Sequence, residues 1–305
     1  MLYVFGHKAP DTDSICSAIA YAYLKNKLGT EAEPCRLGEV NSETKLVLER
    51  FNAEKPKMLE SAEGKDVILV DHNEFEQSAK GIERANILEI VDHHKMKFSW
   101  DKPITIITLP WGSTATIITK LFSYHRIEIP REIAGLLLSA ILSDTVIFRS
   151  PTCTEIDREV AKKLAETAGI DNVQEWGIKM FRAKSAIAEK SARDIIFNDY
   201  KVYDFSGRKV LIGQIEVVSD EEVLERKEEI LEEMERLRQE ENYYAVLLMV
   251  TDIMKQGSTL LLASESSEPF EKAFNAKFEQ SSAYLQGVMS RKKQVVPPLE
   301  RVFSG

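Results

Sequence analysis

The chain is poor in cysteine and has no long apolar run. Its three cysteines, Cys16, Cys35 and Cys153, are far apart and form no CxxC pair, so the sequence indicates neither a disulfide framework nor a thiolate zinc site. No stretch reaches the roughly 18 uncharged apolar residues that a membrane span needs. The N-terminus lacks both the apolar run and the small-residue cleavage site of a signal peptide. We therefore expect a cytoplasmic protein with no membrane partner.

An excess of positive charge is also lacking. The chain carries 49 acidic residues against 40 Lys and Arg, a formal net charge of -9. Affinity for a phosphate backbone rests mainly on surplus Lys and Arg, so we do not expect a general nucleic-acid binder. A small phosphate substrate remains compatible with this balance, because metal ions and a few well-placed bases can hold it.

The length of 305 residues exceeds the usual size of a single core, which predicts two domains. The first half alternates short apolar runs with helical patterns, as expected for an α/β domain whose mainly parallel sheet is flanked by helices. The pattern changes near residue 190, and a smaller α/β domain with a mixed sheet is expected beyond it. We place the N-terminal domain at 1–188, a linker at 189–192 and the C-terminal domain at 193–305.

The apolar periodicity also predicts individual elements. Strands are expected at 2–5, 66–70, 87–91, 209–218, 243–250 and 259–263. Helices are expected from a cap at Asp13 or Ser14 to Gly29, from near 113 or 114, over 130–142, over 155–168 and over 220–241. The last is strongly acidic with interleaved Arg and Lys, which predicts a solvent-exposed face stabilised by i,i+4 ion pairs.

Acidic residues and histidines gather where the predicted strands and one apolar helix end. These segments are His7 to Asp13, Asp71-His72-Asn73, Asp92-His93-His94-Lys95 and Ser143-Asp144-Thr145. Ligands bind beyond the carboxyl ends of strands in an open parallel sheet, so the four segments should converge on one crevice.

The composition of these segments points to metal ions. Four of the five histidines lie in them, and carboxylates that share a site without cations repel one another. This many ligands can hold two divalent ions, and mixed imidazole and carboxylate ligands favour Mn²⁺, Co²⁺, Fe²⁺ or Zn²⁺ over Mg²⁺. Taken singly, such an Asp is usually a turn former or helix cap, and such a His a satisfied polar residue. The four segments occurring in order favour a metal site.

The ordered set GHxxPDTD, VDHN, VDHHK and SDT resembles the DHH phosphoesterase superfamily. The segment SRKKQVVP at residues 290–297 resembles the substrate-binding domain of family II, manganese-dependent inorganic pyrophosphatases. The resemblance spans nearly the whole chain and shows no long regulatory insertion. It implies hydrolysis of inorganic pyrophosphate to two phosphates by a two-metal mechanism, with a metal-bridging hydroxide as the nucleophile.

The resemblance also implies the metal ions and their ligands. Two Mn²⁺ per subunit are expected, with Co²⁺ as the alternative ion, and Mg²⁺ arrives with the substrate. The implied ligands are His7 and Asp11 for the first metal, Asp13, His93 and Asp144 for the second, and Asp71 as the bridge between them.

Further roles follow for residues beside the ligands. His94 directly follows a ligand histidine and should point elsewhere, toward the substrate. The resemblance implies that it contacts the phosphates and supplies a proton toward the leaving group. The predicted catalytic residues are thus His94, Asp71 and Asp13. Asp92 and His72 are expected to orient an imidazole rather than bind metal.

The C-terminal domain should supply cations for the substrate. Arg291 and Lys292 match the substrate-binding pair of the family, and Lys201 matches its third basic contact, which together with His94 completes the predicted substrate-binding set. Charge-assisted donors of this kind suit pyrophosphate, and Arg can contact two oxygens at once. Because the metal ligands lie in the N-terminal domain and the cations in the C-terminal domain, we expect the two domains to close over the substrate. A homodimer through the N-terminal domains, formed by joining edge strands, is also implied.

Other functions share parts of this pattern. An exopolyphosphatase or another DHH phosphoesterase would use the same metal site, and sequence does not reveal the width of the cleft. A DHH nuclease or nucleotide phosphatase usually carries a glycine-rich, histidine-containing C-terminal motif, which nothing here resembles. A binding protein with a vestigial site would lack at least one ligand, whereas the ligand set here is complete.

Overall fold

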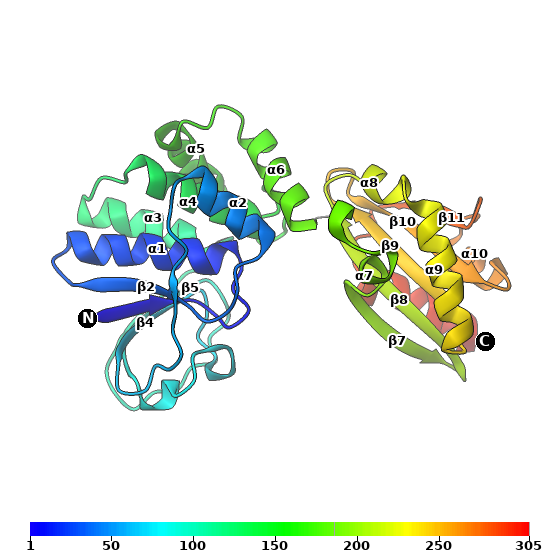
Figure 1. Ribbon diagram of the computed structural model, residues 1–305, viewed down its shortest axis with the longest axis horizontal. Helices are drawn as coiled ribbons and strands as arrows, with labels where there is room; N and C mark the ends of the chain where they lie inside the picture. The colour runs from blue at the N-terminus through cyan, green and yellow to red at the C-terminus, as the bar shows by residue number, and fades with distance from the viewer. Residues whose placement is uncertain (186, 305) are drawn as a thin grey trace. The chain divides into compact units, whose positions relative to one another are not determined.

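A computed structural model describes residues 1–185 and 187–304 (Figure 1). The chain forms two compact units, Met1–Lys184 and Ser185–Gly305, called here the N-terminal and C-terminal units. Each unit has its own sheet and helices, which confirms the predicted α/β class with two domains. Among the described residues, no helix is long and apolar enough to span a membrane.

The N-terminal unit contains a parallel sheet of six strands in the order β3-β2-β1-β4-β5-β6. The strands are β1 Leu2–Phe5, β2 Ala32–Arg36, β3 Lys57–Met58, β4 Asp66–Val70, β5 Asn86–Asp92 and β6 Thr105–Thr108. The order reverses between β1 and β4, and in such sheets this switch point is where ligands bind, beyond the carboxyl ends of the strands.

The helices of this unit gather on one side of the sheet in Figure 1. They are α1 Thr12–Lys27, α2 Ser42–Arg50, α3 Thr114–His125, α4 Arg131–Asp144, α5 Glu155–Ala168 and α6 Val173–Ser185. A separate apolar cluster on the sheet includes Phe5, Leu69 and Ile87, and side chains from short 3-10 turns and loops, such as Phe75 and Trp100, pack against it. The 3-10 turns are Phe75–Gln77 and Ile82–Arg84.

Helix ends follow local sequence in most places. The expected helix over 155–168 is confirmed at both ends: Thr154 and Asp157 form a capping box, and Gly169 ends the helix in the left-handed region. The expected cap of the first helix at Asp13 or Ser14 is wrong, because Asp11 is the N-cap and its side chain accepts a hydrogen bond from the Ser14 amide. Asp13 instead accepts backbone amides at the start of α3.

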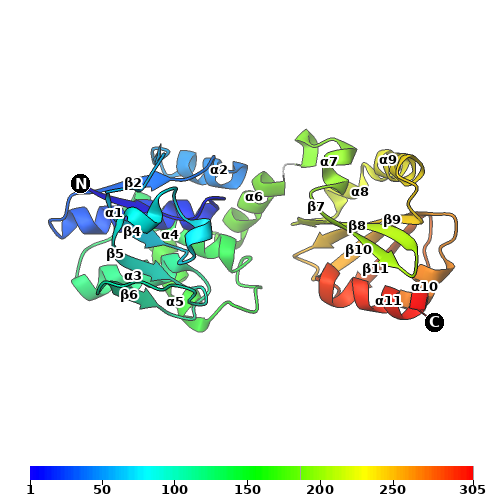
Figure 2. The ribbon, with the colours of Figure 1, turned by 90° about the horizontal axis from the view of Figure 1, so that it is seen from below.

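The C-terminal unit contains a mixed sheet of five strands in the order β11-β10-β9-β8-β7, in which only β8 and β9 run parallel. The strands are β7 Asp199–Phe205, β8 Arg208–Val217, β9 Ala245–Asp252, β10 Gly257–Ser264 and β11 Ser282–Gln286. The helices are α7 Ala192–Ile196, α8 Glu221–Leu224, α9 Lys227–Glu240, α10 Glu268–Phe274 and α11 Val296–Ser304, with a 3-10 turn at Ile187–Glu189 and a π-helical turn at Arg291–Val295. Figure 2 shows α7, α8 and α9 on one face of this sheet and α10 and α11 on the other, and each face has its own apolar core.

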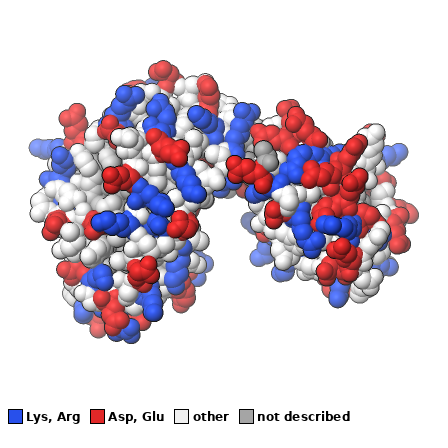
Figure 3. Space-filling view, in the orientation of Figure 1, with Lys and Arg blue, Asp and Glu red and all other residues white. Residues whose placement is uncertain are grey.

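The single helix expected over 220–241 is interrupted, which corrects the sequence prediction. The chain leaves helical geometry at Arg226, whose guanidinium donates hydrogen bonds to the carbonyl oxygens of Ile187 and Lys190. The charged face of α9 is exposed, as Figure 3 shows. Its ion pairs are mostly at i,i+3 spacing, such as Arg238 with Glu235, rather than at the expected i,i+4.

Candidate active site

The loops after β1, β4 and β5 meet at the switch point of the N-terminal sheet. Gly6, which follows β1, allows this approach: a Cβ there would lie 1.8 Å from the Ser14 Oγ of α1. Asp71 directly follows β4 and adopts a left-handed conformation, with φ of 60°. A non-glycine residue in that region costs energy and is often found at functional sites. The crevice expected from the sequence therefore forms where these strands end.

The first ligand group contains His7, Asp11 and Asp71. The His7 Nε2 lies 3.5 Å from the Asp11 Oδ2 and 3.5 Å from the Asp71 Oδ2. Asp11 accepts the Ser14 amide through its Oδ1 at 2.9 Å, which leaves its Oδ2 facing the site. Burial lowers the pKa of His7, but hydrogen bonding to Asp11 and the charges of Asp11 and Asp13 outweigh that effect and raise it overall.

The second group contains Asp13, Asp71, His93 and Asp144. The His93 Nε2 lies 3.5 Å from the Asp71 Oδ1 and 3.4 Å from the Asp144 Oδ2. The His93 Nδ1 is 2.9 Å from the Trp111 carbonyl oxygen, which only accepts, so Nδ1 carries the hydrogen and Nε2 presents a lone pair. This Nε2 is buried and has no hydrogen-bond partner within residues 1–185 and 187–304. A lone pair aimed at carboxylate oxygens fits a divalent metal ion.

Asp13 is held in the second group by α3. Its carboxylate accepts the backbone amides of Thr114 and Ala115, at 2.7 and 3.1 Å, and the Ser17 hydroxyl at 3.0 Å. A carboxylate at a helix N-terminus is stabilised by the unsatisfied amides and the helix dipole. These bonds explain why Asp13 does not cap its own helix.

Asp71 belongs to both groups, with one oxygen directed to each. Burial, together with the charge of Asp13 and then of Asp11, raises the pKa of Asp71 well above its usual value. Burial and the charges of Asp13 and Asp71 do the same for the pKa of Asp144. Buried carboxylates this close together cannot all ionise unless cations compensate them. The electrostatics and the ligand geometry therefore both favour divalent ions.

His94 and Asp92 form a pair beside the metal ligands. The His94 Nδ1 and backbone amide both bond to the Asp92 Oδ1, at 2.9 and 3.1 Å, while Asn73 donates to the Asp92 Oδ2 at 2.6 Å. The hydrogen bond to Asp92 raises the pKa of His94, against the effect of burial. Burial alone would raise the pKa of Asp92, but the hydrogen bonds from His94 and Asn73 lower it overall. The expectation that Asp92 orients an imidazole is confirmed.

The same expectation for His72 is wrong. Its two ring nitrogens contact the Val70 carbonyl oxygen at 2.9 Å and the Ser78 Oγ at 3.1 Å, so they orient no other imidazole. Burial lowers the pKa of His72 to about 4, and the ring therefore stays neutral. The two hydrogen bonds of His72 instead stabilise the loop after β4.

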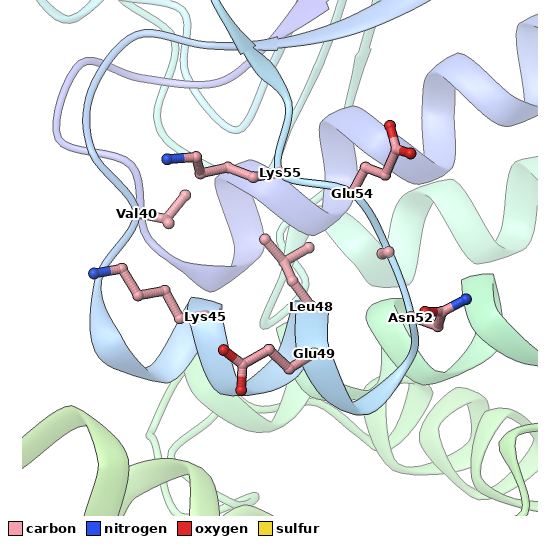
Figure 4. Close-up of a pocket in the computed structure, with 8 residues that line it drawn as sticks. Val40, Lys45, Leu48, Glu49, Asn52, Glu54 and Lys55 are labelled. Atoms are coloured by element: carbon pink, nitrogen blue, oxygen red, sulfur yellow. The ribbon is translucent and has the colours of Figure 1, made fainter.

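A pocket of about 400 Å³ opens over these side chains. Its lining includes His7, Asp11, Asp71, His72, Asn73, His94, Lys95 and Asp144. A second pocket, of about 470 Å³, lies beside α2 and is shown in Figure 4. Its lining, which includes Lys45, Glu49 and Lys55, mixes both signs of charge and contains no His or Asp. The first pocket is therefore the candidate active site.

Sequence reasoning missed two residues that support this site. Asn73 connects Asp92 to the loop after β5, because its side chain also donates to the Lys95 carbonyl and accepts the Lys97 amide. Its place two residues after Asp71 was the signal that could have drawn attention to it. Glu43 is fully buried beneath the site, and burial raises its pKa. No local sequence signal distinguishes Glu43 from a surface glutamate.

The predicted cations lie on the C-terminal unit. The Arg291 guanidinium donates to the carbonyl oxygen and to the Oδ1 of Asp199, the latter at 2.8 Å, and to the Ile212 carbonyl at 3.3 Å. Lys201 is exposed and lies two residues after Asp199 on β7, so the two side chains share one face of the sheet. Lys292 is exposed on the π-helical turn. Arg291 and Lys201 thus occupy the same region of this unit.

Comparisons with known proteins agree with this two-part organisation. The DHH family, N-terminal domain, matches residues 1–141, and the DHHA2 domain matches residues 178–302. The manganese-dependent inorganic pyrophosphatase of Methanocaldococcus jannaschii is 48% identical, with all of both chains covered. That of Bacillus subtilis is 46% identical, over 98% of this chain and 97% of the relative.

A solved structure gives the same result. A crystal structure from Methanococcus jannaschii, assigned to the family II inorganic pyrophosphatases, is 47% identical, covers all of both chains and superposes with a TM-score of 0.67. Identity of this level over the full length, together with both domain matches, shows that the chain belongs to the family of manganese-dependent inorganic pyrophosphatases.

Proposed function

We propose that this protein hydrolyses inorganic pyrophosphate to two phosphates in a manganese-dependent reaction. The observation that carries the proposal is the position of Asp71. Its Oδ2 lies 3.5 Å from the His7 Nε2, and its Oδ1 lies 3.5 Å from the His93 Nε2, so a single carboxylate joins two ligand groups. Full-length relatives named for this activity support the choice of substrate.

The ligand groups divide between two ions. His7, Asp11 and Asp71 would hold the first, and Asp13, Asp71, His93 and Asp144 the second. Imidazole and carboxylate donors suit Mn²⁺ or Co²⁺, and Mg²⁺ accompanies the substrate. When bound, two such ions would polarise phosphoryl oxygens and lower the pKa of the attacking water.

His94 is suited to donate a proton to the leaving phosphate. Its Nδ1 is occupied by Asp92, which leaves Nε2 free to face the substrate pocket that His94 lines. The raised pKa keeps this imidazole protonated to higher pH than an ordinary histidine. A protonated imidazole both binds a phosphate oxygen and supplies the proton that the departing group needs.

Cations of the C-terminal unit bind the substrate in this proposal. Arg291, Lys201 and Lys292 provide charge-assisted donors for the phosphoryl oxygens. The bonds from Arg291 to Asp199 and Ile212 hold its guanidinium in a defined orientation before substrate binds. Such preorganisation reduces the entropy lost on binding.

The proposed assembly is a homodimer through the N-terminal units. β6 is an edge strand of four residues, and its Ile106 is 44% exposed. An edge strand with unpaired backbone groups and an apolar side chain favours pairing with another strand. Sedimentation as a monomer at micromolar concentration would refute this assembly.

The activity is tested with metal-stripped protein that is reloaded with Mn²⁺ in the presence of Mg²⁺. Phosphate release is measured from pyrophosphate, long-chain polyphosphate and a dinucleotide, with Asp71→Asn as the inactive control. Rapid turnover of pyrophosphate alone supports the proposal. Preference for polyphosphate would assign the alternative, exopolyphosphatase activity, to the same metal site. No turnover of any substrate with bound Mn²⁺ would contradict the enzymatic proposal.

A further inference from the structure

We propose that Glu43 is a positioning residue that fixes the segments carrying Asp11, Asp13 and Asp144 relative to one another. The inference rests on the proposed function in so far as those carboxylates hold metal ions. Glu43 lies in the first turn of α2, far along the chain from both segments. It is 0% exposed.

A single oxygen of Glu43 joins two helices of the site. The Glu43 Oε2 accepts the Thr12 hydroxyl at 2.8 Å and the Ser143 hydroxyl at 2.8 Å. Thr12 stands between Asp11 and Asp13 in the first turn of α1, and Ser143 directly precedes Asp144 at the end of α4. Glu43 therefore links the start of α1 to the end of α4 from beneath the ligands.

Stability alone does not account for a glutamate at this position. A carboxylate that is removed from water costs free energy unless its oxygens are fully hydrogen-bonded. The Glu43 Oε1 is buried and has no hydrogen-bond partner among the described residues. Val47, one turn further along α2, is equally buried and apolar, and the buried Thr44 beside Glu43 is neutral, so Glu43 is the one charged residue that α2 buries. This charged residue is the one that contacts both ligand segments.

The link should matter most for Asp144. Asp11 is independently held as the N-cap of α1, and Asp13 by the amides of Thr114 and Ala115. For Asp144, the hydroxyl of its neighbour Ser143 ties the end of α4 to Glu43. Loss of Glu43 should thus weaken the second metal group, which contains Asp144, more than the first.

The test compares Mn²⁺ binding to the metal-stripped full chain and to its Glu43→Ala and Glu43→Gln variants. Calorimetric titration at 25 °C gives the stoichiometry and the affinity of each site. We expect Glu43→Ala to bind one of two Mn²⁺ about 10- to 100-fold more weakly, the usual effect of removing a group that orients a ligand. Glu43→Gln should retain most of the affinity, because its amide oxygen accepts the same two hydroxyls.

Val47→Ala is the matched control. It removes buried volume from the same helix and leaves the hydrogen bonds of Glu43 to Thr12 and Ser143 in place, so it should lower Tm while leaving both Mn²⁺ affinities unchanged. If Glu43→Ala does not fold, Ser143→Ala removes one of the two hydrogen bonds and should lower the Mn²⁺ affinity of the same site by a smaller factor. Wild-type affinity in both Glu43→Ala and Ser143→Ala would overturn the inference, as would equal weakening by Val47→Ala or by Glu43→Gln.

Failure of this inference is distinguishable from failure of the proposed function. Pyrophosphate turnover is measured at saturating Mn²⁺ on the same preparations. If the wild type binds two Mn²⁺ and turns over pyrophosphate while Glu43→Ala binds Mn²⁺ normally, only the role of Glu43 is wrong. If the wild type binds no pair of ions or does not turn over pyrophosphate, the proposed function itself fails.

Discussion

Asp92→Asn should lower the pKa of His94 and shift its titration to lower pH. Asp92 is 0% exposed and accepts bonds from His94 on one oxygen and from Asn73 on the other. In the variant one oxygen becomes an amide nitrogen, which can only donate and must face either the His94 Nδ1–H or the Asn73 amide. Either orientation breaks a hydrogen bond. The substitution itself also removes the negative charge that stabilises protonated His94.

The size of the shift follows from the environment of the pair. A hydrogen bond to a charged group contributes about 1.5–3 kcal/mol. The His94 side chain is 53% exposed, so solvent screening places its bond at the lower end of that range. Loss of the bond should therefore disfavour protonated His94 by about 1.5 kcal/mol, and the His94 pKa should fall in the variant.

The metal-free protein is the best material for this measurement, because histidine resonances can be followed by NMR across pH. If His94 acts as the proton donor, the alkaline limb of kcat/KM for the Mn²⁺-loaded enzyme moves to lower pH by a similar amount. An unchanged or raised His94 pKa would refute the argument.

The same pair predicts a pH window for stability. The folded-state pKa of His94 is raised, so its contribution is complete below its ordinary value of 6.5 and is lost as pH rises through the folded pKa. The folded-state pKa of Asp92 is lowered, so its contribution is complete above 3.8 and is lost as pH falls through the folded pKa. Asp92→Asn should therefore destabilise the metal-free protein most between these two values.

Three further changes test other parts of the structure. Chelation with EDTA should lower Tm at pH 8 and should lower it less as pH falls, because Asp71 and Asp144, whose pKa values are raised, then bind protons in place of the metal charge. A Tm that chelation leaves unchanged at pH 8 contradicts the metal assignment. Gly135→Ala should cost about 1–3 kcal/mol of unfolding free energy in denaturant titrations. The reason is that its Cβ would lie 2.1 Å from the Phe51 ring, and wild-type stability would show that the ring moves freely. Asp199→Ala should raise KM for pyrophosphate by roughly fivefold with kcat little changed, because the substrate must then order the Arg291 side chain at a cost of about 1 kcal/mol. A lowered KM would instead mean that Asp199 competes with the substrate for Arg291.

The sequence by itself determined the chemistry of the candidate site and the class of the fold. Short apolar runs located the strands that precede His7, Asp71 and His93, and a parallel sheet brings the carboxyl ends of such strands to one edge. The order of the motifs identified the family, which the full-length relatives confirm. These features were readable because each depends on residues close together in the chain or on a rule that applies to all parallel sheets.

Only the tertiary structure decided which polar groups support the ligands. Asp13 is held by α3 rather than by its own helix, Arg226 interrupts an otherwise continuous helical pattern, and Glu43 reaches Ser143, one hundred positions further along the chain. Local propensity cannot predict such contacts, because each partner alone reads as an ordinary surface residue or helix cap. Their geometry arises only when distant segments pack together, and burial then makes each hydrogen bond costly to lose.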